Sequence, residues 1–327
     1  MVSVIIPTYN RAQYIERAIT SVLNQTYKDF EIIVVDDNDP ETEARKALEE
    51  KMMKYKNNSK IKYLQHPKNM NGAVARNTGI KEAKGEYITF LDDDDYFISN
   101  RLEKMVNSLE KRKDYSAAYS STIVTNNKKI IGNSIAEKSG KMKNELLKGT
   151  FSFGTGSNMF FRAEAIKNIN GFDESFKRHQ DIETMIRFFD IGKLLAVKEY
   201  LVVKTQDDRS NEPNMKKYIE IKKNYFKAFD KDIANLNDDD KSQFYKRNFL
   251  ELAEASIRSR NKENYKKFIG QAKKYNKITC KEKVRIILLK INNYIKIEKF
   301  KYFIKRVILN FRISKETMKE IVYYEDM

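Results

Sequence analysis

Short apolar runs alternate with amphipathic segments over the first two hundred residues. Residues 2–6 form a continuous β-branched run that ends at Pro7, which predicts a buried strand. The following segment carries apolar residues at helical spacing, namely Ile15, Ala18, Ile19 and Val22. Asn10 is placed to cap this helix. Residues 31–35 are again apolar, so the order strand, helix, strand predicts parallel strands joined by a right-handed crossover.

The same pattern repeats further along the chain. We predict strands at residues 61–64, 87–91 and 158–162, and helices at residues 73–83 and 181–189. Three of the predicted strands are followed by residues that could contact a ligand. The first strand is followed by Pro7 and Tyr9, the second by Asp36 and Asp37, and the strand at 87–91 by Asp92, Asp93, Asp94 and Asp95. Ligands bind beyond the carboxyl ends of the strands in an open parallel sheet. We therefore expect these side chains along one edge of the sheet.

The run from Asp92 to Asp95 is the strongest chemical signal. Carboxylates this close repel one another, and a divalent cation relieves that repulsion. Oxygen ligands favour a hard ion, Mg²⁺ or Mn²⁺, which bridges the phosphate oxygens of a nucleotide. Such a run is also typical of a solvated loop or helix cap. Arg76, in the predicted helix before it, offers a planar donor fork for carboxylate or diphosphate, although it fits a surface position equally well.

From about residue 215 the strand signals stop. Helical periodicity predicts helices at residues 215–229, 241–260, 262–275 and 281–311, which together favour a small bundle. The final turn, around Met318 and Ile321, is apolar on one side, so it either folds back on the core or docks on another subunit. A chain of 327 residues supports two units, which we place at residues 1–214 and 215–327.

The charge is concentrated in the second of these parts. The whole chain has a net charge of +17, and residues 211–327, with 29 basic and 16 acidic residues, contribute +13 of it. Such a field attracts nucleic acid, anionic lipid headgroups or a phosphate-bearing polymer, although solubility alone explains it as well. The interleaved aromatic and basic pattern of a nucleic-acid stacking platform is missing, so we do not expect nucleic acid as a partner.

The cysteine and histidine content bears on the cellular location of the protein and on the kind of metal site it could contain. Cys280 is the single cysteine, which suits a reducing compartment, and no apolar run approaches the length of a membrane span or signal peptide. We expect a cytoplasmic protein. His66 and His179 are the only histidines, so a histidine metal site is a weaker hypothesis than the aspartate cluster. Residues 154–157 (GTGS) are either a flexible turn or a place where backbone approaches a substrate.

Four segments in order resemble the family-2 glycosyltransferases with a GT-A fold. They are VSVIIPTYNR at 2–11, LNQTYKDFEIIVVDD at 23–37, NGAVARNTGIKEAKGEYITFLDDDD at 71–95 and NMFFRAEAIKNINGFDESFKRHQDIE at 158–183, covering roughly residues 1–205. The resemblance implies an α/β, Rossmann-like mixed sheet flanked by helices and followed by a smaller basic, mainly helical domain. It also implies metal-dependent, inverting transfer from a UDP-sugar with Mn²⁺ or Mg²⁺.

The resemblance assigns roles to individual residues. Pro7 and Tyr9 line the base pocket, Asp37 receives a hydrogen bond from uracil, and Asn69 and Arg76 border the nucleotide. Asp94 is the direct metal ligand with Asp92 as a second, while Asp92 and Asp93 lie nearer the ribose and donor sugar. Asp181 is the catalytic base, with helix capping as the alternative interpretation, and Arg209 adds positive charge near the leaving diphosphate.

The sequence departs from the family pattern at three places. Gln180 precedes Asp181 where the family commonly has glutamate, and Asp36-Asp37-Asn38-Asp39 replaces the usual Asp-Asp-x-Ser. The Gln-x-x-Arg-Trp motif of processive synthases is missing, and the chain contains no tryptophan. We therefore expect transfer of single sugars.

With its basic helical tail, the chain is also similar to the soluble N-acetylglucosaminyltransferases of poly(ribitol phosphate) wall teichoic acid, which assemble as trimers through C-terminal regions. This implies transfer of GlcNAc from UDP-GlcNAc in β-linkage to an anionic glycopolymer, by a homotrimer. Arg258, Arg260 and Lys262 are candidates for holding that polymer, although cations at a helix end also suit the helix dipole. The alternative is a transferase of capsule or lipid-linked glycan synthesis, associated peripherally with the inner face of the membrane.

Overall fold

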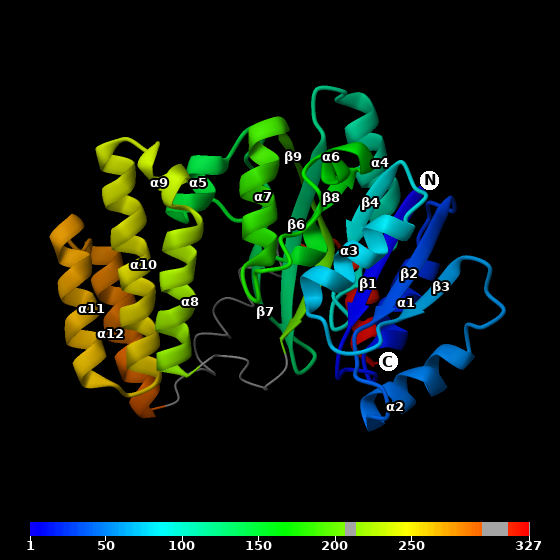
Figure 1. Ribbon diagram of the computed structural model, residues 1–327, viewed down its shortest axis with the longest axis horizontal. Coiled ribbons are helices and arrows are strands. Elements are labelled where there is room, and N and C mark those ends of the chain that lie inside the picture. Colours follow the sequence, from blue (N-terminus) through cyan, green and yellow to red (C-terminus); the bar gives the residue numbers. More distant parts are fainter. Residues whose placement is uncertain (207–213, 296–312, 327) are drawn as a thin grey trace. The chain divides into compact units, whose positions relative to one another are not determined.

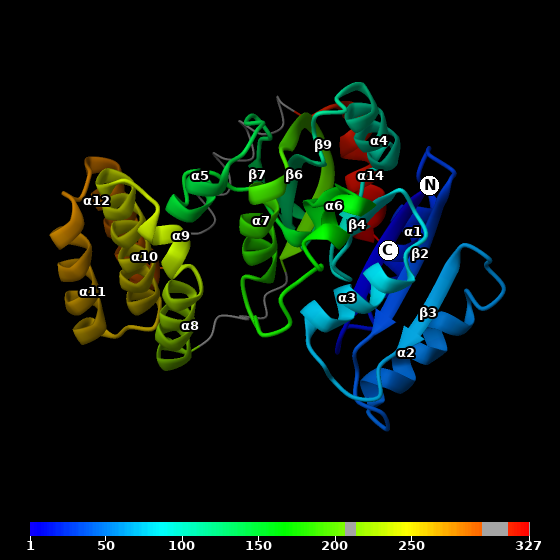
Figure 2. The same ribbon diagram turned by 45° about the horizontal axis from the view of Figure 1, so that its top comes forward.

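The computed structural model describes residues 1–206, 214–295 and 313–326 (Figures 1 and 2). Within these ranges the chain forms two compact units. The first contains residues 1–142, 153–206 and 313–326, and the second contains residues 143–152 and 214–295. The division predicted at residue 214 therefore differs in two segments: residues 143–152 belong to the helical unit, and the C-terminal helix belongs to the unit with the sheet.

Parallel strands form one half of the sheet in the first unit. In spatial order they are β3 (Ile61–Gln65), β2 (Phe30–Asp36), β1 (Val2–Thr8) and β4 (Tyr87–Phe90). β1 and β4 are almost wholly buried, as their β-branched and aromatic composition predicts. The helices between these strands are α1 (Ile15–Leu23), α2 (Glu43–Met53) and α3 (Gly72–Glu82). The predicted order of these strands, α1 and α3 is confirmed here, whereas α2 was not predicted.

The other half of the sheet is mixed. β8 (Phe160–Arg162) pairs antiparallel with β4 and with β6 (Ala117–Asn126). β6 pairs in parallel with β9 (Leu194–Gln206) and antiparallel with β7 (Lys129–Ser134), and β5 (Tyr96–Phe97) closes the order on β9. The described residues thus form one nine-stranded sheet. The expected GT-A-like mixed α/β sheet is confirmed.

Four helices and one 3₁₀ turn complete the region between β5 and β9. They are α4 (Arg101–Lys111), α5 (Lys143–Lys148), the turn η1 (Gly156–Asn158), α6 (Ala163–Asn168) and α7 (Gln180–Ile191). Asn158 lies in the 3₁₀ turn, so the strand predicted at 158–162 begins two residues later. Asn158 is buried, and its side-chain amide donates to the backbone carbonyl of Ser120 on β6 at 2.6 Å. This contact holds Asn158 in the turn, outside the strand ladder.

The predicted cap of α1 is wrong. α1 begins at Ile15 after Tyr14, and no side chain caps its first turn. Asn10 instead adopts a left-handed conformation with φ of 60°, and its backbone N–H donates to Asn38 Oδ1 at 2.7 Å. Asparagine tolerates this conformation better than most residues, so it turns the chain after β1 rather than starting the helix.

The C-terminal helix α14 (Lys315–Asp326) lies against the sheet of the first unit (Figures 1 and 2). Ile321 and Tyr324 are buried in a cluster with Tyr96, whose ring centroid is 5.1 Å from that of Tyr324. Glu320 accepts hydrogen bonds at 2.7 Å from the backbone and hydroxyl of Ser99. Of the two predicted alternatives for this terminus, folding back on the core is confirmed.

The second unit is helical. Besides α5 it contains α8 (Met215–Ala228), α9 (Asp230–Ala234), α10 (Asp238–Arg258), α11 (Lys262–Tyr275) and α12 (Cys280–Ile295), as Figure 1 shows. Apolar residues of α10, α11 and α12 form its core, with Leu250, Ala272 and Ile286 among them. Buried Lys222 binds Asn248 and Glu251, which satisfies its charge. No helix in the described ranges is long and apolar enough to cross a membrane.

Candidate active site

Asp37 fixes the loop that leads into α3. Its carboxylate lies just beyond β2, is buried, and accepts from the backbone N–H of Met70 at 2.8 Å and of Asn71 at 3.0 Å. Asn69 Nδ2 donates at 2.9 Å, and His66 Nδ1 lies 2.7 Å away. These four contacts use the acceptor positions that a carboxylate offers. Asp37 therefore holds the loop in place, and its hydrogen bond with uracil stays a prediction.

His66 extends this network below the loop. Its Nε2 lies 2.9 Å from Thr78 Oγ1 on α3, and its carbonyl accepts from Arg45 at 2.7 Å. Arg45 also pairs with buried Asp36 at 3.2 Å. The ends of β2 and β3 are thereby tied to α3, which positions the arginine that α3 carries. This histidine is structural, and the sequence gives no periodic signal for that role.

Pro7 and Tyr9 lie at the carboxyl end of β1, next to β2. Pro7 pairs with Val35 in the parallel ladder and is half-buried. Tyr9 is 47% exposed, which is unusual for so large an apolar ring. A flat aromatic surface beyond a strand end suits the face of a nucleobase, as predicted for this position.

Arg76 joins two parts of the site. Asn71 caps α3 by accepting from the N–H of Ala73 at 2.8 Å, and Arg76 follows one turn later on the helix. Its Nη2 donates to Asp92 Oδ1 at 2.5 Å, and its Nη1 donates to Gln180 Oε1 at 3.0 Å. The guanidinium therefore links the acidic turn after β4 to the start of α7. Sequence analysis places Arg76 at the nucleotide but misses its contact with Gln180.

The acidic turn concentrates negative charge in a small buried volume. Burial, followed by repulsion from Asp94, raises the pKa of Asp93 to about 7. The pKa of Asp94 is raised by burial and by Asp92, and the pKa of Asp95 by burial and by Asp94. Arg11 opposes this effect because it pairs with Asp94 Oδ2 and lies 3.6 Å from Asp93.

Neutral groups hold the turn from the other side. Ser157 Oγ donates to Asp95 Oδ2 at 2.6 Å and accepts from the backbone of Asp92 at 3.0 Å. Arg101 is fully buried beneath this serine, donates to its carbonyl at 3.3 Å, and has its pKa lowered to about 9 by burial.

A side chain built on Gly156 would lie 3.8 Å from Asp92 Oδ2 and 3.9 Å from Arg76 Nη2. The GTGS backbone thus lies directly against the ion pair.

The oxygen donors here fit a hard divalent cation, although the described residues contain no ready cluster of three ligand side chains. Asp92 and Asp94 already engage Arg76 and Arg11 respectively. Two carboxylates leave room for diphosphate oxygens and water, which is the usual pattern for Mg²⁺. Burial and then repulsion between neighbouring carboxylates raise the pKa values of Asp93 and Asp94, and a cation at this turn would offset the repulsion.

Asp181 lies in the first turn of α7 and is half-buried. Its Oδ1 accepts from the adjacent N–H of Ile182 at 2.9 Å. His179, in a left-handed conformation with φ of 59°, occupies the N-cap position, so Asp181 is not the capping residue. Through its neighbour Gln180, Asp181 is adjacent to Arg76.

The remaining predicted residues lie elsewhere. Arg209 falls outside the described residues. Arg258 ends α10, Lys262 begins α11, and Arg260 lies between them with φ of 55°; all three are exposed and belong to the helical unit. Arg11, which pairs with Asp94, was not among the predicted site residues. It stands within the VSVIIPTYNR segment, directly after the aromatic and polar positions, so its place in that motif was the available signal.

The mixed sheet and the helices that flank it form a GT-A-like fold. The family model described as "Glycosyl transferase family 2" matches residues 3–169, about half of the chain. The chain belongs to glycosyl transferase family 2.

Two curated relatives illustrate the range of that family. The chain is 30% identical over 223 residues to poly(ribitol-phosphate) beta-N-acetylglucosaminyltransferase TarP of Staphylococcus aureus, covering 66% of each chain. It is 38% identical over 136 residues to UDP-Glc:alpha-D-GlcNAc-diphosphoundecaprenol beta-1,3-glucosyltransferase WfgD of Escherichia coli, covering 42% of this chain and 51% of the relative. The chain spans about half the length, or less, of several curated relatives that it matches.

The fold extends beyond the matched family region. The structure of S. aureus TarS residues 1–349 in complex with UDP-GlcNAc superposes with a TM-score of 0.56 at 16% sequence identity. That similarity covers 85% of this chain and 93% of the other, which shows a shared fold that includes the helical region after the sheet.

Proposed function

We propose that the chain is an inverting, metal-dependent transferase that moves GlcNAc from UDP-GlcNAc onto hydroxyl groups of poly(ribitol phosphate). Support for this substrate pair comes from TarP, named for that activity, and from TarS, whose structure was determined with UDP-GlcNAc. The observation that carries the proposal is the bridge from Asp92 through Arg76 to Gln180, because it joins the acidic turn to the residue next to Asp181.

The donor would lie beyond the parallel strands. Tyr9 and Pro7 supply a surface for the base, and the loop held by Asp37 and Asn69 borders it. Arg76 is positioned to receive negative charge as the diphosphate leaves, which is where preorganised donors contribute most to rate. A bound divalent ion, held by Asp94 and Asp92, would act as a Lewis acid on the same diphosphate.

Asp181 would take the proton of the attacking hydroxyl. In a displacement with inversion, the C1–O bond to UDP breaks as the new C1–O bond forms on the opposite face, so a single carboxylate base suffices. Asp181 lies in the first turn of α7, and its carboxylate is the side chain next to Gln180. Arg258, Arg260 and Lys262 are proposed to hold the phosphates of the acceptor, and a trimer formed through the helical unit would present several such surfaces.

The test is a panel of UDP-sugars against purified poly(ribitol phosphate), read by released UDP with Mn²⁺, Mg²⁺ or EDTA. We expect release with UDP-GlcNAc in the presence of metal and the polymer, a β-linkage in the product by NMR, and a trimer by analytical ultracentrifugation. UDP release with a different UDP-sugar would contradict the proposed donor. UDP release in the presence of EDTA would contradict the proposed dependence on a metal ion.

A second candidate has support of its own. Relatives from E. coli and Campylobacter jejuni carry names of beta-1,3-glucosyltransferases that act on diphosphoundecaprenol-linked glycans. The alternative is therefore transfer to a lipid-linked or capsular glycan. Adding a synthetic diphosphate-lipid glycan to the same panel separates the two, since a phosphate polymer and a lipid-linked sugar present different acceptors to the same donor site.

A further inference from the structure

Helix α12 carries two apolar stripes. Ile286 and Leu289 pack toward α10 in the core of the helical unit. A second set, Val284, Ile287, Leu288 and Ile291, recurs at intervals of three, one and three residues, so it forms one face of the helix. These four side chains are 39 to 54% exposed. Exposed apolar residues in such a regular array mark an interaction surface more often than scattered ones do.

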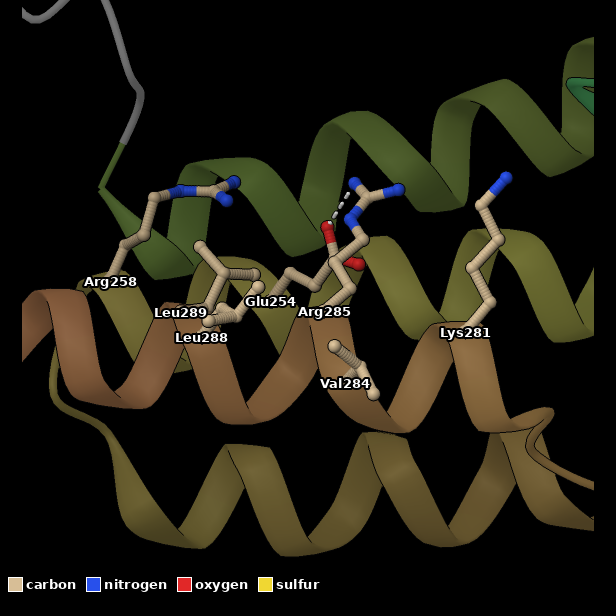
Figure 3. Close-up of a pocket in the computed structure, with 7 residues that line it drawn as sticks. All are labelled: Glu254, Arg258, Lys281, Val284, Arg285, Leu288 and Leu289. Atoms are coloured by element: carbon tan, nitrogen blue, oxygen red, sulfur yellow. Dashed lines mark hydrogen bonds and ion pairs between the residues drawn. The ribbon is translucent and has the colours of Figure 1, made fainter. Parts of the chain in front are cut away.

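A cationic pocket of about 420 Å³ lies beside this stripe, between α10 and α12 (Figure 3). Its apolar wall includes Val284 and Leu288. Three cations, Arg258, Lys281 and Arg285, line the pocket, and their side chains point to the same side of the helix pair in Figure 3. Buried Glu254 pairs with Arg285 at 2.6 Å and fixes its direction.

We propose that this face of α12 binds the surface of an anionic lipid bilayer. Headgroup phosphates would lie at Arg258, Lys281 and Arg285, and the stripe from Val284 to Ile291 would enter the boundary with the acyl chains. The combination of apolar and cationic side chains on one helix is the pattern of an interfacial helix. Because no helix in the described ranges can cross a membrane, the helix would lie in the plane of the surface.

Charge and apolarity together favour a bilayer over a dissolved phosphate polymer. Either ligand satisfies the three cations, but a hydrophilic polymer would leave Val284, Ile287 and Leu288 in water. A bilayer covers both features at once, and the positive charge of this part of the chain adds long-range attraction to anionic headgroups. This surface goes beyond the proposed transfer reaction and concerns where that reaction would take place.

Vesicle flotation of the full-length chain tests the surface directly. We expect binding to vesicles of phosphatidylcholine and phosphatidylglycerol (roughly 7:3) to exceed binding to phosphatidylcholine alone by about tenfold or more, and to weaken with salt. The double variant Val284→Ser/Leu288→Ser should lose about tenfold in binding, since it removes apolar insertion but keeps every cation. Val322→Ser/Tyr323→Ser is the matched control, because these residues of α14 are 57% and 55% exposed.

Two outcomes would overturn the inference: equal binding to neutral and anionic vesicles, and unchanged binding of the Val284/Leu288 variant. A third result would also overturn it: the wild type does not bind vesicles, and the Val284/Leu288 variant changes its oligomeric mass. The stripe would then be a contact surface for a second copy of the chain. If the double variant unfolds, Lys281→Gln tests the cationic part of the surface instead: its binding to anionic vesicles should fall, and unchanged binding would contradict the inference. Release of UDP with a soluble acceptor should be unchanged in the Val284/Leu288 variant, so loss of flotation leaves the proposed reaction intact.

Discussion

Arg76 Nη1 donates to Gln180 Oε1 at 3.0 Å, across 104 positions of sequence, while the same guanidinium pairs with Asp92. Glutamine at this position accepts a hydrogen bond without a negative charge of its own. Arg76 therefore keeps more of its positive charge for another anion than it would beside the glutamate that the family commonly carries. The two ends of the site, the acidic turn and the start of α7, are coupled through this one side chain.

Substituting Arg76→Gln should lower kcat/KM by about a hundredfold or more, because it removes a preorganised donor from the leaving diphosphate. The effect is expected mainly in kcat, with a smaller rise in KM for the UDP-sugar. Arg162→Gln serves as the control, since Arg162 pairs with Glu110 at 3.2 Å and contacts none of the site residues described above. Steady-state UDP release decides the matter: similar losses in both variants would remove Arg76 from the mechanism.

Asp181→Asn should reduce turnover by about a thousandfold while leaving the affinity for UDP-sugar within a few fold of wild type. Asparagine keeps the shape of the side chain and cannot accept a proton. Asp190→Asn, at the exposed end of the same helix, should have little effect. Calorimetric titration of donor and single-turnover rates separate binding from chemistry. Equal loss of both in Asp181→Asn would show that this residue binds the donor and is not the base.

The sequence predicted the parallel half of the sheet well because β1, β2 and β4 are nearly continuous apolar runs. β6 escaped prediction. Its buried residues include Ser120, Ser121 and Thr122, so the segment lacks the apolar run that indicates a buried strand. These polar side chains are accommodated through hydrogen bonds to distant residues, such as that from Ser120 to Asn158. β5 has two residues and no pattern of its own.

The site followed the same logic. Arg76, the acidic turn and Asp181 were singled out because all three stand in the segments that resemble the family. The contacts among them join residues far apart in sequence, as Arg11 with Asp94 shows, and no local pattern encodes such pairs. The use of Asp37 as the anchor of a loop depends likewise on where residues 66–71 return to the end of β2.

Gly156→Ala should weaken donor binding without destabilising the fold. The added methyl group would make ordinary contacts at 3.8 Å with Asp92 and 3.9 Å with Arg76, so it fits the apoprotein but occupies space beside their ion pair. We expect KM for the UDP-sugar to rise about tenfold. Gly132→Ala is the control because its added methyl would lie 3.9 Å from Val124 on β6. Unchanged KM would place the donor away from the GTGS turn.

Removal of Arg11 should tighten divalent-ion binding. Its guanidinium pairs with Asp94 and lies near Asp93, so it neutralises charge that an ion at this turn would otherwise compensate. In Arg11→Gln the affinity for Mn²⁺, measured from the electron paramagnetic resonance of free ion, should rise by about tenfold, equivalent to about 1.4 kcal/mol. Arg17→Gln is a comparison, because Arg17 donates to the backbone carbonyl of Asp94 and to Thr205 Oγ1, whereas Arg11 pairs with the Asp94 carboxylate. Weaker Mn²⁺ binding in Arg11→Gln would mean that the arginine organises the ion site.

Asp93 should make the stability of the metal-free protein depend on pH. Its pKa of about 7 in the folded state exceeds the ordinary aspartate value of 3.8, so the folded state holds the proton more tightly than the unfolded state does. The stabilisation is complete below about pH 4 and is lost as the pH rises toward 7, by at most about 4 kcal/mol. Asp94 and Asp95, whose pKa values are also raised, contribute with the same sign.

Urea unfolding at several pH values, with EDTA present, measures this dependence. In Asp93→Asn the fall in unfolding free energy between pH 4 and 7 should become shallower, because asparagine does not ionise and also removes a repulsive neighbour of Asp94. The control is Asp190→Asn, an exposed position on α7 that should reproduce the wild-type slope. Parallel plots of unfolding free energy against pH for Asp93→Asn and wild type would mean that Asp93 is not protonated in the folded state. Arg11 and Arg76 alone would then balance the negative charge of the turn.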